Sequence, residues 1–379
     1  MDFILSDEQR LIQQTSHEFA EKEIYPVSAE HDEQASWPAE IHRKAWELGL
    51  MNITVPEAYG GPGLGCLDNV LVTEQLCWGC VGIGVGIVLN ALPNEVLMVG
   101  GSEEQKKQYL GRLTENGEYA AYAVTEPCAG SDVAGIQTRA IKRGNEYVLN
   151  GSKIWISNAN HASWYTVMAK TDPNSGHKGM SFFLVERDTP GLEVGKPIPK
   201  LGQKAGWTAE VFMDDVVVPE SSLIGQEGEG FKIAMKTFDG SRPMVAAFAL
   251  GLMQRCLDLS LSYAKERKTF GVPIIEHQSV AHKLAEMQMR IEASRLMTYQ
   301  AAWLADQGKR NTLQASCAKA FACDAVMWAA TEAMQIYGGY GYSKEYPIEK
   351  LFRDAKVLQV YEGTSEIQRN IIARELASR

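Results

Sequence analysis

The chain has 379 residues, so at roughly 100 to 200 residues per domain it is predicted to fold into two or three domains. Hydrophobic residues make up 45% and charged residues 22% of it, a globular composition that excludes long disordered regions. Its 37 Lys and Arg residues face 47 Asp and Glu residues, and a net charge of −10 without any basic block argues against nucleic acid as a partner.

Two further features predict a cytoplasmic protein that spans no membrane. No run approaches about 18 uninterrupted apolar residues, and the first residues are acidic where a signal peptide would be basic. The seven cysteines are odd in number and scattered, unlike a secreted disulfide framework. We therefore expect them to be reduced thiols.

Helical spacing dominates residues 1–118, which we predict to form an N-terminal helical domain. Ser6 can cap a first helix, after which apolar residues recur at three- and four-residue spacings. The glycine-rich stretch 59–65 must be a loop, because no helix could cross it.

Residues 119–230 change to short runs rich in β-branched and aromatic residues, which predict a central antiparallel β domain. Asn150-Gly151 separates two of these runs and can adopt the positive φ angles of a two-residue turn, so we expect a hairpin there. Six prolines in this segment fit a loop-rich antiparallel unit better than alternating βαβ units.

Residues 231–379 return to helix and are predicted to form a C-terminal helical domain. Long helical segments are expected near 231–267, 279–307 and 313–337, each followed by glycine-containing punctuation. The whole chain is thus an α+β multidomain protein.

Several kinds of site are disfavoured by spacing. No histidine has a second ligand at zinc-binding spacing, so we expect no metal. Cys77 and Cys80 could form a redox pair, but they follow a helical run, which favours buried core cysteines. No Gly-x-Gly-x-x-Gly follows a strand, and no phosphate-binding loop or nucleophile elbow is present.

Four compact polar clusters remain as candidate functional residues. Residues 122–132 combine hydroxyls with turn formers that can expose backbone N–H groups to a ligand, although a structural loop is equally compatible. Trp155 beside Ser157 ends a strand, where a core tryptophan is the alternative. Residues 266–271 place cations at a helix end, either as a cap or as a pyrophosphate contact.

The fourth cluster, residues 361–368, contains a carboxylate just before a predicted helix. Ser365 and Gln368 match a capping box, which would start the last helix near Glu366 and leave Glu362 in the preceding loop. Such a carboxylate could also serve only the helix dipole.

Together, in this order and spacing, the four clusters resemble the flavin-dependent acyl-CoA dehydrogenase family along essentially the whole chain, most closely its medium-chain and short-chain (butyryl-type) members. The resemblance implies a helical domain, a β domain and a C-terminal four-helix-bundle domain, assembled as a homotetramer of two dimers. It implies FAD as the cofactor, an acyl-CoA substrate, and the reaction type of fatty acid β-oxidation, with electrons passed to an electron-transfer flavoprotein.

The same resemblance assigns roles to residues of this chain. Those implied for FAD in the same subunit are Tyr122, Val124, Thr125, Gly130, Ser131, Trp155, Ser157, Thr364 and Glu366. Those implied for the FAD of a neighbouring subunit are Arg267, Thr269, Phe270, His277, Gln278, Gln335, Gly338 and Gly339. Those implied for substrate are Ser131, Asp239, Ser241, Arg242, Tyr361 and Gly363.

Glu362 is the catalytic base that the resemblance implies. Some relatives carry the base directly before the helix arginine, but that position here is Ser241, which leaves the loop carboxylate. A base that removes an α-proton works best when burial raises its pKa toward working pH. The glycine that follows would let substrate approach the backbone.

Some residues depart from the family pattern. Cys128 stands where glycine is more frequent, Trp207 lies in an unusual Gly-Trp-Thr, and Glu366 stands where medium-chain relatives tend to have glutamine. They suggest an altered flavin environment or substrate mouth. Val88 at the expected floor of the acyl pocket and Phe248 on the following helix do not define chain length, because one methylene is worth only about 1 to 3 kcal/mol.

The acyl group is therefore expected to be short or medium, branched or alicyclic. Three other functions remain open: a 2-enoyl-CoA reductase on the same fold, a non-catalytic oligomeric scaffold that has lost FAD and, most remotely, a thiol oxidoreductase.

Overall fold

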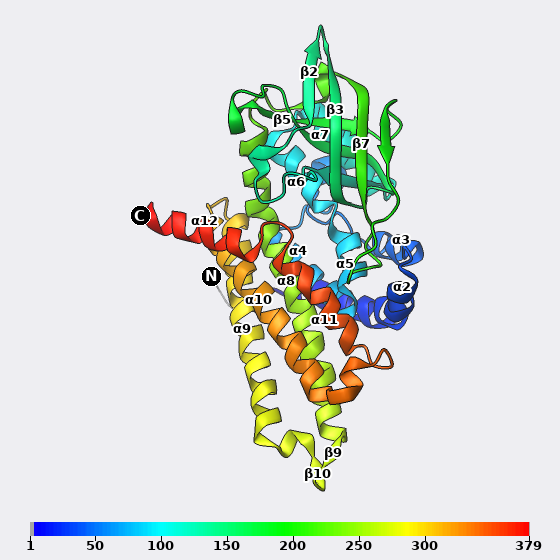
Figure 1. Cartoon of the computed structure of the whole chain (residues 1–379), viewed down its shortest axis with the longest axis vertical. Coiled ribbons are helices and arrows are strands. Elements are labelled where there is room, and N and C mark those ends of the chain that lie inside the picture. The colour runs from blue at the N-terminus through cyan, green and yellow to red at the C-terminus, as the bar shows by residue number, and fades with distance from the viewer. Residues whose placement is uncertain (1–3, 379) are drawn as a thin grey trace.

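The computed structural model describes residues 4–378, which form a helical N-terminal part, a central sheet and a helical C-terminal part (Figure 1). This is the three-domain order predicted from the sequence. In Figure 1 the sheet lies at one end of the molecule and the long C-terminal helices run toward the other.

From residue 4 onward, seven α-helices precede the sheet, and the first begins as predicted. Ser6 caps it in a capping box, with its Oγ accepting from the Gln9 N–H at 3.1 Å. No helix forms between Gly60 and Gly65, which confirms the predicted loop. The helices are α1 (Asp7–Phe19), α2 (Ser28–Gln34), α3 (Ala39–Glu47), α4 (Cys66–Gly79), α5 (Val81–Val88), α6 (Ala91–Gly100) and α7 (Glu103–Glu115).

The central sheet has the order β6-β7-β3-β2-β4-β5-β8, with β1 pairing on β4. Most pairs are antiparallel, but β1 runs parallel to β4, so the sheet is not wholly antiparallel as predicted. The strands are β1 (Tyr119–Ala123), β2 (Arg139–Arg143), β3 (Glu146–Ser157), β4 (Ala162–Lys170), β5 (Met180–Glu186), β6 (Leu192–Val194), β7 (Thr208–Pro219) and β8 (Leu223–Ile224).

The hairpin expected at Asn150-Gly151 is wrong, because both residues lie inside the single long strand β3. The pairing of β3 with β7 shifts register between Leu149 and Gly151, and the Asn150 side chain donates to Asp215 and accepts from its backbone N–H. The Asn-Gly pair therefore makes a β-bulge, the other structure in which these residues are favoured. A Cβ at Gly151 would also lie only 2.4 Å from the Thr138 hydroxyl.

The C-terminal part contains the three predicted long helices, whose ends fall within two residues of the expected positions. A small hairpin of β9 (Lys268–Thr269) and β10 (Val272–Pro273) joins the first two at the end of the molecule farthest from the sheet (Figure 1). The helices are α8 (Gly230–Glu266), α9 (Gln278–Asp306), α10 (Thr312–Tyr337), α11 (Ile348–Lys356) and α12 (Ser365–Ala377).

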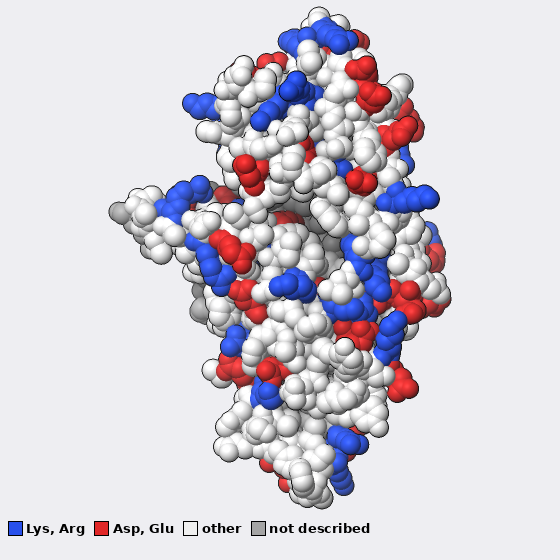
Figure 2. Space-filling view, in the orientation of Figure 1, with Lys and Arg blue, Asp and Glu red and all other residues white. Residues whose placement is uncertain are grey.

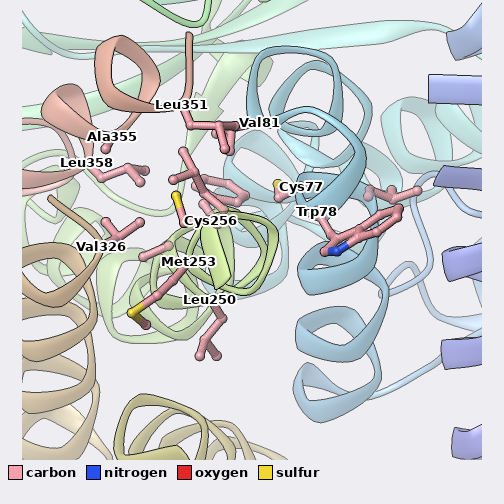
Figure 3. Packing of buried hydrophobic residues seen from close by; sticks show 14 of the residues in the cluster. Cys77, Trp78, Val81, Leu250, Met253, Cys256, Val326, Leu351, Ala355 and Leu358 are labelled. Carbon is pink, nitrogen blue, oxygen red and sulfur yellow. The ribbon is translucent and has the colours of Figure 1, made fainter. Parts of the chain in front are cut away.

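The main hydrophobic core joins the N-terminal helices to the C-terminal ones. Figure 3 shows Cys77 of α4 on the side toward Met253 and Cys256 of α8, while Trp78 points to the other side of α4. Val326 of α10 belongs to the same core. Cys77 is a free buried thiol, and burial raises its pKa well above the usual value. Cys80 is also a free thiol buried in this core, so the prediction of core cysteines is confirmed.

Two helical stretches, Val81–Gly100 and Gly230–Glu266, are long and apolar enough by composition to cross a membrane. In both, 78% of the tested window is buried inside the protein, as is usual for the core helices of a globular fold.

Candidate active site

A cavity of about 1290 Å³ lies where the sheet, the N-terminal helices and the C-terminal helices meet. Figure 2 shows a hollow in the middle of one face, with Lys and Arg side chains beside it. Because pockets for a single small ligand usually measure about 300 to 1,000 Å³, this cavity can hold more than one ligand. One part of its wall is apolar and is formed by Val85, Leu89, Leu92, Phe238 and Phe248.

Glu362 lies on the cavity wall, in the loop between a 3₁₀ turn (Val357–Gln359) and α12. The helix begins one residue earlier than predicted, because Thr364, and not Ser365, is its N-cap: the Thr364 hydroxyl accepts from the Ile367 N–H at 3.2 Å. Gln368 instead turns back, and its amide donates to the carbonyls of Glu362 and Gly363 at 3.0 and 3.2 Å.

The Glu362 carboxylate is partly buried and has a single hydrogen-bond donor within residues 4–378. Ser241 of α8 donates to its Oε2 at 2.6 Å. Burial raises the pKa of Glu362, while the Ser241 bond and the charges of Lys319 and Arg242 oppose that rise. The result is a carboxylate that binds protons more readily than an exposed glutamate, as a base for a weak carbon acid requires.

The backbone N–H of Glu362 donates to no other group in the described part of the chain. It belongs to a residue that lines the cavity, with φ of 51°. A free N–H beside a carboxylate is the pair of groups that proton removal next to a carbonyl needs, because the N–H can stabilise the oxyanion that forms.

Asp239 and the buried Arg242 form an ion pair at 2.7 Å on the cavity wall. Thr312 donates to the second oxygen of Asp239 at 2.6 Å, and Nε of Arg242 has no partner within residues 4–378. The pair is therefore held in place while one donor of Arg242 stays available. Ser241, between them in sequence, does not line the cavity and contacts Glu362 instead.

The loop after β1 forms another part of the wall and is fixed by a buried ion pair. Lys153 of β3 donates to Glu126 at 2.7 Å and to the Val124 carbonyl at 3.1 Å. Burial alone would raise the pKa of Glu126, but the charge of Lys153 and the N–H groups of Gln137 and Thr138 outweigh it and lower the pKa. Five predicted flavin residues from this segment line the cavity: Tyr122, Val124, Thr125, Gly130 and Ser131.

Trp155 and Ser157 also line the cavity, and the structure shows that Trp155 is not a core residue. Its indole is 53% exposed, on backbone with φ of 62°. Trp207 lies on the same wall, held by a bond of 2.9 Å from its Nε1 to the Ala35 carbonyl.

The polar groups of this wall fit a flavin. The hydroxyls of Tyr122 and Thr208 are buried, face the cavity and have no hydrogen-bond partner in the described residues. Buried hydroxyls are normally paired, so these two indicate a polar ligand. Indole and backbone groups nearby can contact a flat heteroaromatic ring.

The other predicted cofactor residues lie away from this cavity. Phe270 at the tip of the β9–β10 hairpin is 97% exposed, and Thr269 is hydrogen-bonded to His277 at 2.9 Å. The Arg267 guanidinium lies 5.8 Å from the ring of Tyr340, so the hairpin and the 338–342 turn come together at the far end of the bundle. The residues concerned are Arg267, Thr269, Phe270, His277, Gln278, Gln335, Gly338 and Gly339, none of which lines the cavity.

Two other predicted positions differ in the structure. Glu366 is exposed on α12 and does not line the cavity, whereas Thr364 does. Val88 packs into the core and does not line the cavity, whereas the nearby Val85 and Leu89 do. Cys128 is exposed and does not line the cavity either.

Sequence analysis missed several residues of the site. Lys319 and Gln368 hold the loop of Glu362, and Arg310, Arg353 and Arg374 add positive charge to the wall. Of these residues, only the three arginines have a sequence signal, because arginines near the predicted base can indicate contacts to an anionic ligand. Within residues 4–378 no three His, Cys, Asp or Glu side chains gather as metal ligands would.

Comparison with known proteins was made for sequence and structure. Of curated proteins, cyclohexane-1-carbonyl-CoA dehydrogenase of Geobacter metallireducens is 44% identical over 99% of this chain and 98% of its own length. Acryloyl-CoA reductase (NADH) of Anaerotignum propionicum is 41% identical over 100% of this chain and 97% of its own.

Among solved structures, butyryl-CoA dehydrogenase of Megasphaera elsdenii superposes with a TM-score of 0.96 at 40% identity, covering 100% of both chains. A chain from the structure of the electron transferring flavoprotein of Acidaminococcus fermentans has a TM-score of 0.97 at 41% identity, also over 100% of both chains.

Three family models match in succession. They describe the N-terminal domain (residues 6–117), the middle domain (121–216) and the C-terminal domain (228–377) of acyl-CoA dehydrogenases. The chain therefore belongs to the acyl-CoA dehydrogenase family, FAD-dependent flavoprotein oxidoreductases that act on the CH–CH bond of acyl-CoA.

Proposed function

We propose that this chain dehydrogenates a short- or medium-chain, branched or alicyclic acyl-CoA to the 2-enoyl-CoA and passes the electrons to an electron-transfer flavoprotein. The observation that carries the proposal is the placement of Glu362: a partly buried carboxylate with a raised pKa, beside its own unpaired N–H, on the wall of a cavity with an apolar end.

The residues divide the chemistry between them. Glu362 takes the α-proton, and its N–H stabilises the thioester oxygen as negative charge develops there. Arg242, held by Asp239, supplies a cation for the CoA portion. The apolar wall takes the acyl group. FAD, when bound, supplies the acceptor for the hydride that leaves the β carbon.

An alicyclic or branched acyl group is supported by the relative named for cyclohexane-1-carbonyl-CoA. The electron-transfer flavoprotein as partner is supported by the similarity to a chain from a structure titled for such a protein. A cytoplasmic location is supported by the seven cysteines, all of which are free.

A homotetramer is part of the same proposal. The aromatic side chain of Phe270 is almost fully exposed at the hairpin tip, and a second copy of the chain would cover it. In such an assembly the predicted cofactor residues near this tip would contact the FAD of the second copy.

A second candidate function is reduction of a 2-enoyl-CoA. A 41% identical relative carries the name acryloyl-CoA reductase, and the same acid–base group serves both directions by microscopic reversibility. Arg242, Glu362 and the apolar wall do not distinguish the two directions.

The test is anaerobic spectroscopy of the purified holoenzyme with linear, branched and alicyclic saturated acyl-CoA esters. We expect one ester to bleach the flavin absorbance and electron-transfer flavoprotein to restore it. Bleaching by no saturated ester, together with reoxidation of the reduced enzyme by a 2-enoyl-CoA, would identify the reductase. Failure to bind FAD would contradict both functions and favour the scaffold.

A further inference from the structure

Lys319 of α10 is a buried lysine whose ammonium contacts the loop of Glu362 from behind. Its side chain is fully buried, and Nζ donates to the Leu358 carbonyl at 2.9 Å and the Gly363 carbonyl at 2.8 Å. These two carbonyls lie on either side of Glu362 in the chain. Within residues 4–378 Lys319 forms no ion pair, although a buried ammonium is normally paired with a carboxylate.

The loop between these two carbonyls has a backbone that needs support. Glu362 and Gly363 both have positive φ, 51° and 88°. For a non-glycine residue this left-handed conformation costs about 1 to 3 kcal/mol and persists only where neighbouring groups hold it. The carbonyls of residues 358, 362 and 363 all accept from the side chains of Lys319 or Gln368.

Gly363 packs against the Gln368 side chain and has a φ of 88°, a conformation that other residues rarely adopt. A Cβ at this position would lie 2.6 Å from the Gln368 side-chain nitrogen. The side chains of Lys319 and Gln368 therefore hold the loop from α10 and α12. The Glu362 N–H has no hydrogen-bond partner in the described residues.

We propose that Lys319 is a positioning residue for catalysis: its ammonium fixes both ends of the base loop, and its unpaired charge acts on the Glu362 carboxylate. Lys319 touches neither substrate nor cofactor, and acts through Glu362. The inference rests on the proposed role of Glu362 as the base.

The electrostatic part follows from the groups around Glu362. The positive charges of Lys319 and Arg242 and the hydroxyl of Ser241 lower its pKa against the effect of burial. The neighbours that face it are Ser241 and Arg242 of α8, Lys319 and Cys323 of α10, Tyr122 of β1, and Tyr361 of its own loop. Among them only Lys319 combines a positive charge with bonds to the loop backbone.

The test compares Lys319→Met holoenzyme with Lys350→Met as a matched control. Lys350 is also a buried lysine, but it is paired with Asp354 at 2.6 Å, and it does not line the cavity. Four quantities are measured for each: FAD content, melting temperature, amide exchange of residues 358–364, and the pH dependence of the limiting rate of flavin bleaching by acyl-CoA.

For Lys319→Met we expect a limiting rate at neutral pH lower by about tenfold to a hundredfold, as for a misplaced catalytic group. We also expect the acid limb of the pH profile, where the rate falls at low pH, to move to higher pH. Amide exchange in the loop should be faster, and the substrate concentration for half-saturation should change little. Lys350→Met should lose melting temperature but keep the acid limb and the loop exchange of the parent.

An unmoved acid limb and unchanged loop exchange in Lys319→Met would overturn the proposal, whatever its melting temperature. Should this variant not fold, Lys319→Gln decides by the same criteria, since its amide can still donate to one carbonyl but carries no charge. Glu362→Gln is measured alongside: if it retains bleaching, the assignment of the base fails, a result separate from either outcome for Lys319.

Discussion

The cavity is bordered by two loops, each held by a buried lysine, and the two lysines are used differently. Lys153 holds the loop after β1 through the carboxylate of Glu126, and its side chain and that of Glu126 are 0% and 3% exposed. Lys319 holds the loop of Glu362 through backbone carbonyls alone. The charge of Lys153 is neutralised by the adjacent Glu126, whereas the charge of Lys319 has no paired carboxylate in the described residues and lowers the pKa of the nearby Glu362.

This difference separates stability from chemistry. A paired buried charge contributes little field beyond its partner, but removing one member leaves the other uncompensated, at a cost of about 3 to 5 kcal/mol. Replacing Lys319 leaves no buried carboxylate without its partner, because its ammonium bonds only to carbonyls. We therefore expect substitutions on the Lys153 side to unfold the protein or release FAD, and those on the Lys319 side to change rate and pH dependence.

The largest effect is expected from Glu362→Gln, which removes the base from the loop anchored by Lys319. Loss of general-base catalysis should slow flavin bleaching by about 10² to 10⁴-fold, because the amide cannot take the proton. Stopped-flow spectroscopy under anaerobic conditions measures this rate.

Glu366→Gln is the matched control, four residues further along the chain. This carboxylate is exposed and does not line the cavity, so its loss should leave the bleaching rate nearly unchanged. Equal losses in the two variants would mean that net negative charge near α12, and not a specific base, governs the rate.

The second effect is expected from Lys153→Met, which leaves the carboxylate of Glu126 buried without its partner. We expect a loss of about 3 to 5 kcal/mol in the free energy of unfolding and weaker retention of FAD. Denaturant titration and the flavin-to-protein ratio measure the two effects.

Lys142→Met serves as the control for this variant, because Lys142 pairs with Glu220 on the surface at 2.5 Å. Its side chain is 46% exposed, and surface pairs of this kind contribute about 0 to 1 kcal/mol. If both variants lose equally little stability, the Lys153 pair is not the anchor that we describe.

Much of the fold was predictable because its signals are local. The Ser6 capping box and the punctuation after the long helices lie within a few residues of the structures that they specify. Asn150-Gly151 shows the limit: the same dipeptide suits a turn or a bulge, and the choice depends on β7, some sixty residues away, whose Asp215 binds Asn150.

The candidate site was predictable where one segment supplies it and not where several meet. Glu362 and the polar cluster at 122–131 were found from short motifs, and Glu362 and most residues of that cluster line the cavity. Lys319 lies 43 residues before Glu362, on a helix face whose neighbour is set by packing, so nothing local indicates that its ammonium reaches the loop. Val88 was misplaced for a related reason, since only the helix rotation decides whether it or Val85 faces the cavity.

A smaller effect is expected from Ser241→Ala, which removes the donor to the Glu362 carboxylate without disturbing the Lys319 anchors. The bond to Ser241 lowers the pKa of Glu362, so its loss raises that pKa further above the usual value. The rate depends on the ionised carboxylate and falls as pH drops through this pKa. The acid limb should therefore move to higher pH, with about a tenfold loss of rate at neutral pH.

Ser260→Ala is a suitable control, because Ser260 is a buried serine of the same helix that does not line the cavity. Its pH profile should match the parent. A parental profile for Ser241→Ala as well would show that the charges of Lys319 and Arg242, and not the Ser241 bond, oppose the effect of burial on the pKa of Glu362.

The smallest effect on the folded chain is expected from Phe270→Ala, in a region that neither loop touches. The ring is 97% exposed and buries almost nothing in its own chain, so the melting curve of the secondary structure should change little. If a second copy of the chain places this ring against its FAD, the FAD dissociation constant should rise by about tenfold or less, the range for one aromatic contact of about 0.5 to 1.5 kcal/mol.

Fluorescence titration of the apoprotein measures FAD affinity, and sedimentation measures assembly. Ile141→Ala removes another exposed apolar side chain, which is 52% exposed, and should change neither FAD affinity nor assembly. Equal FAD affinity in the two variants would mean that the cavity closes around the cofactor within one chain, and that the hairpin is not part of the site.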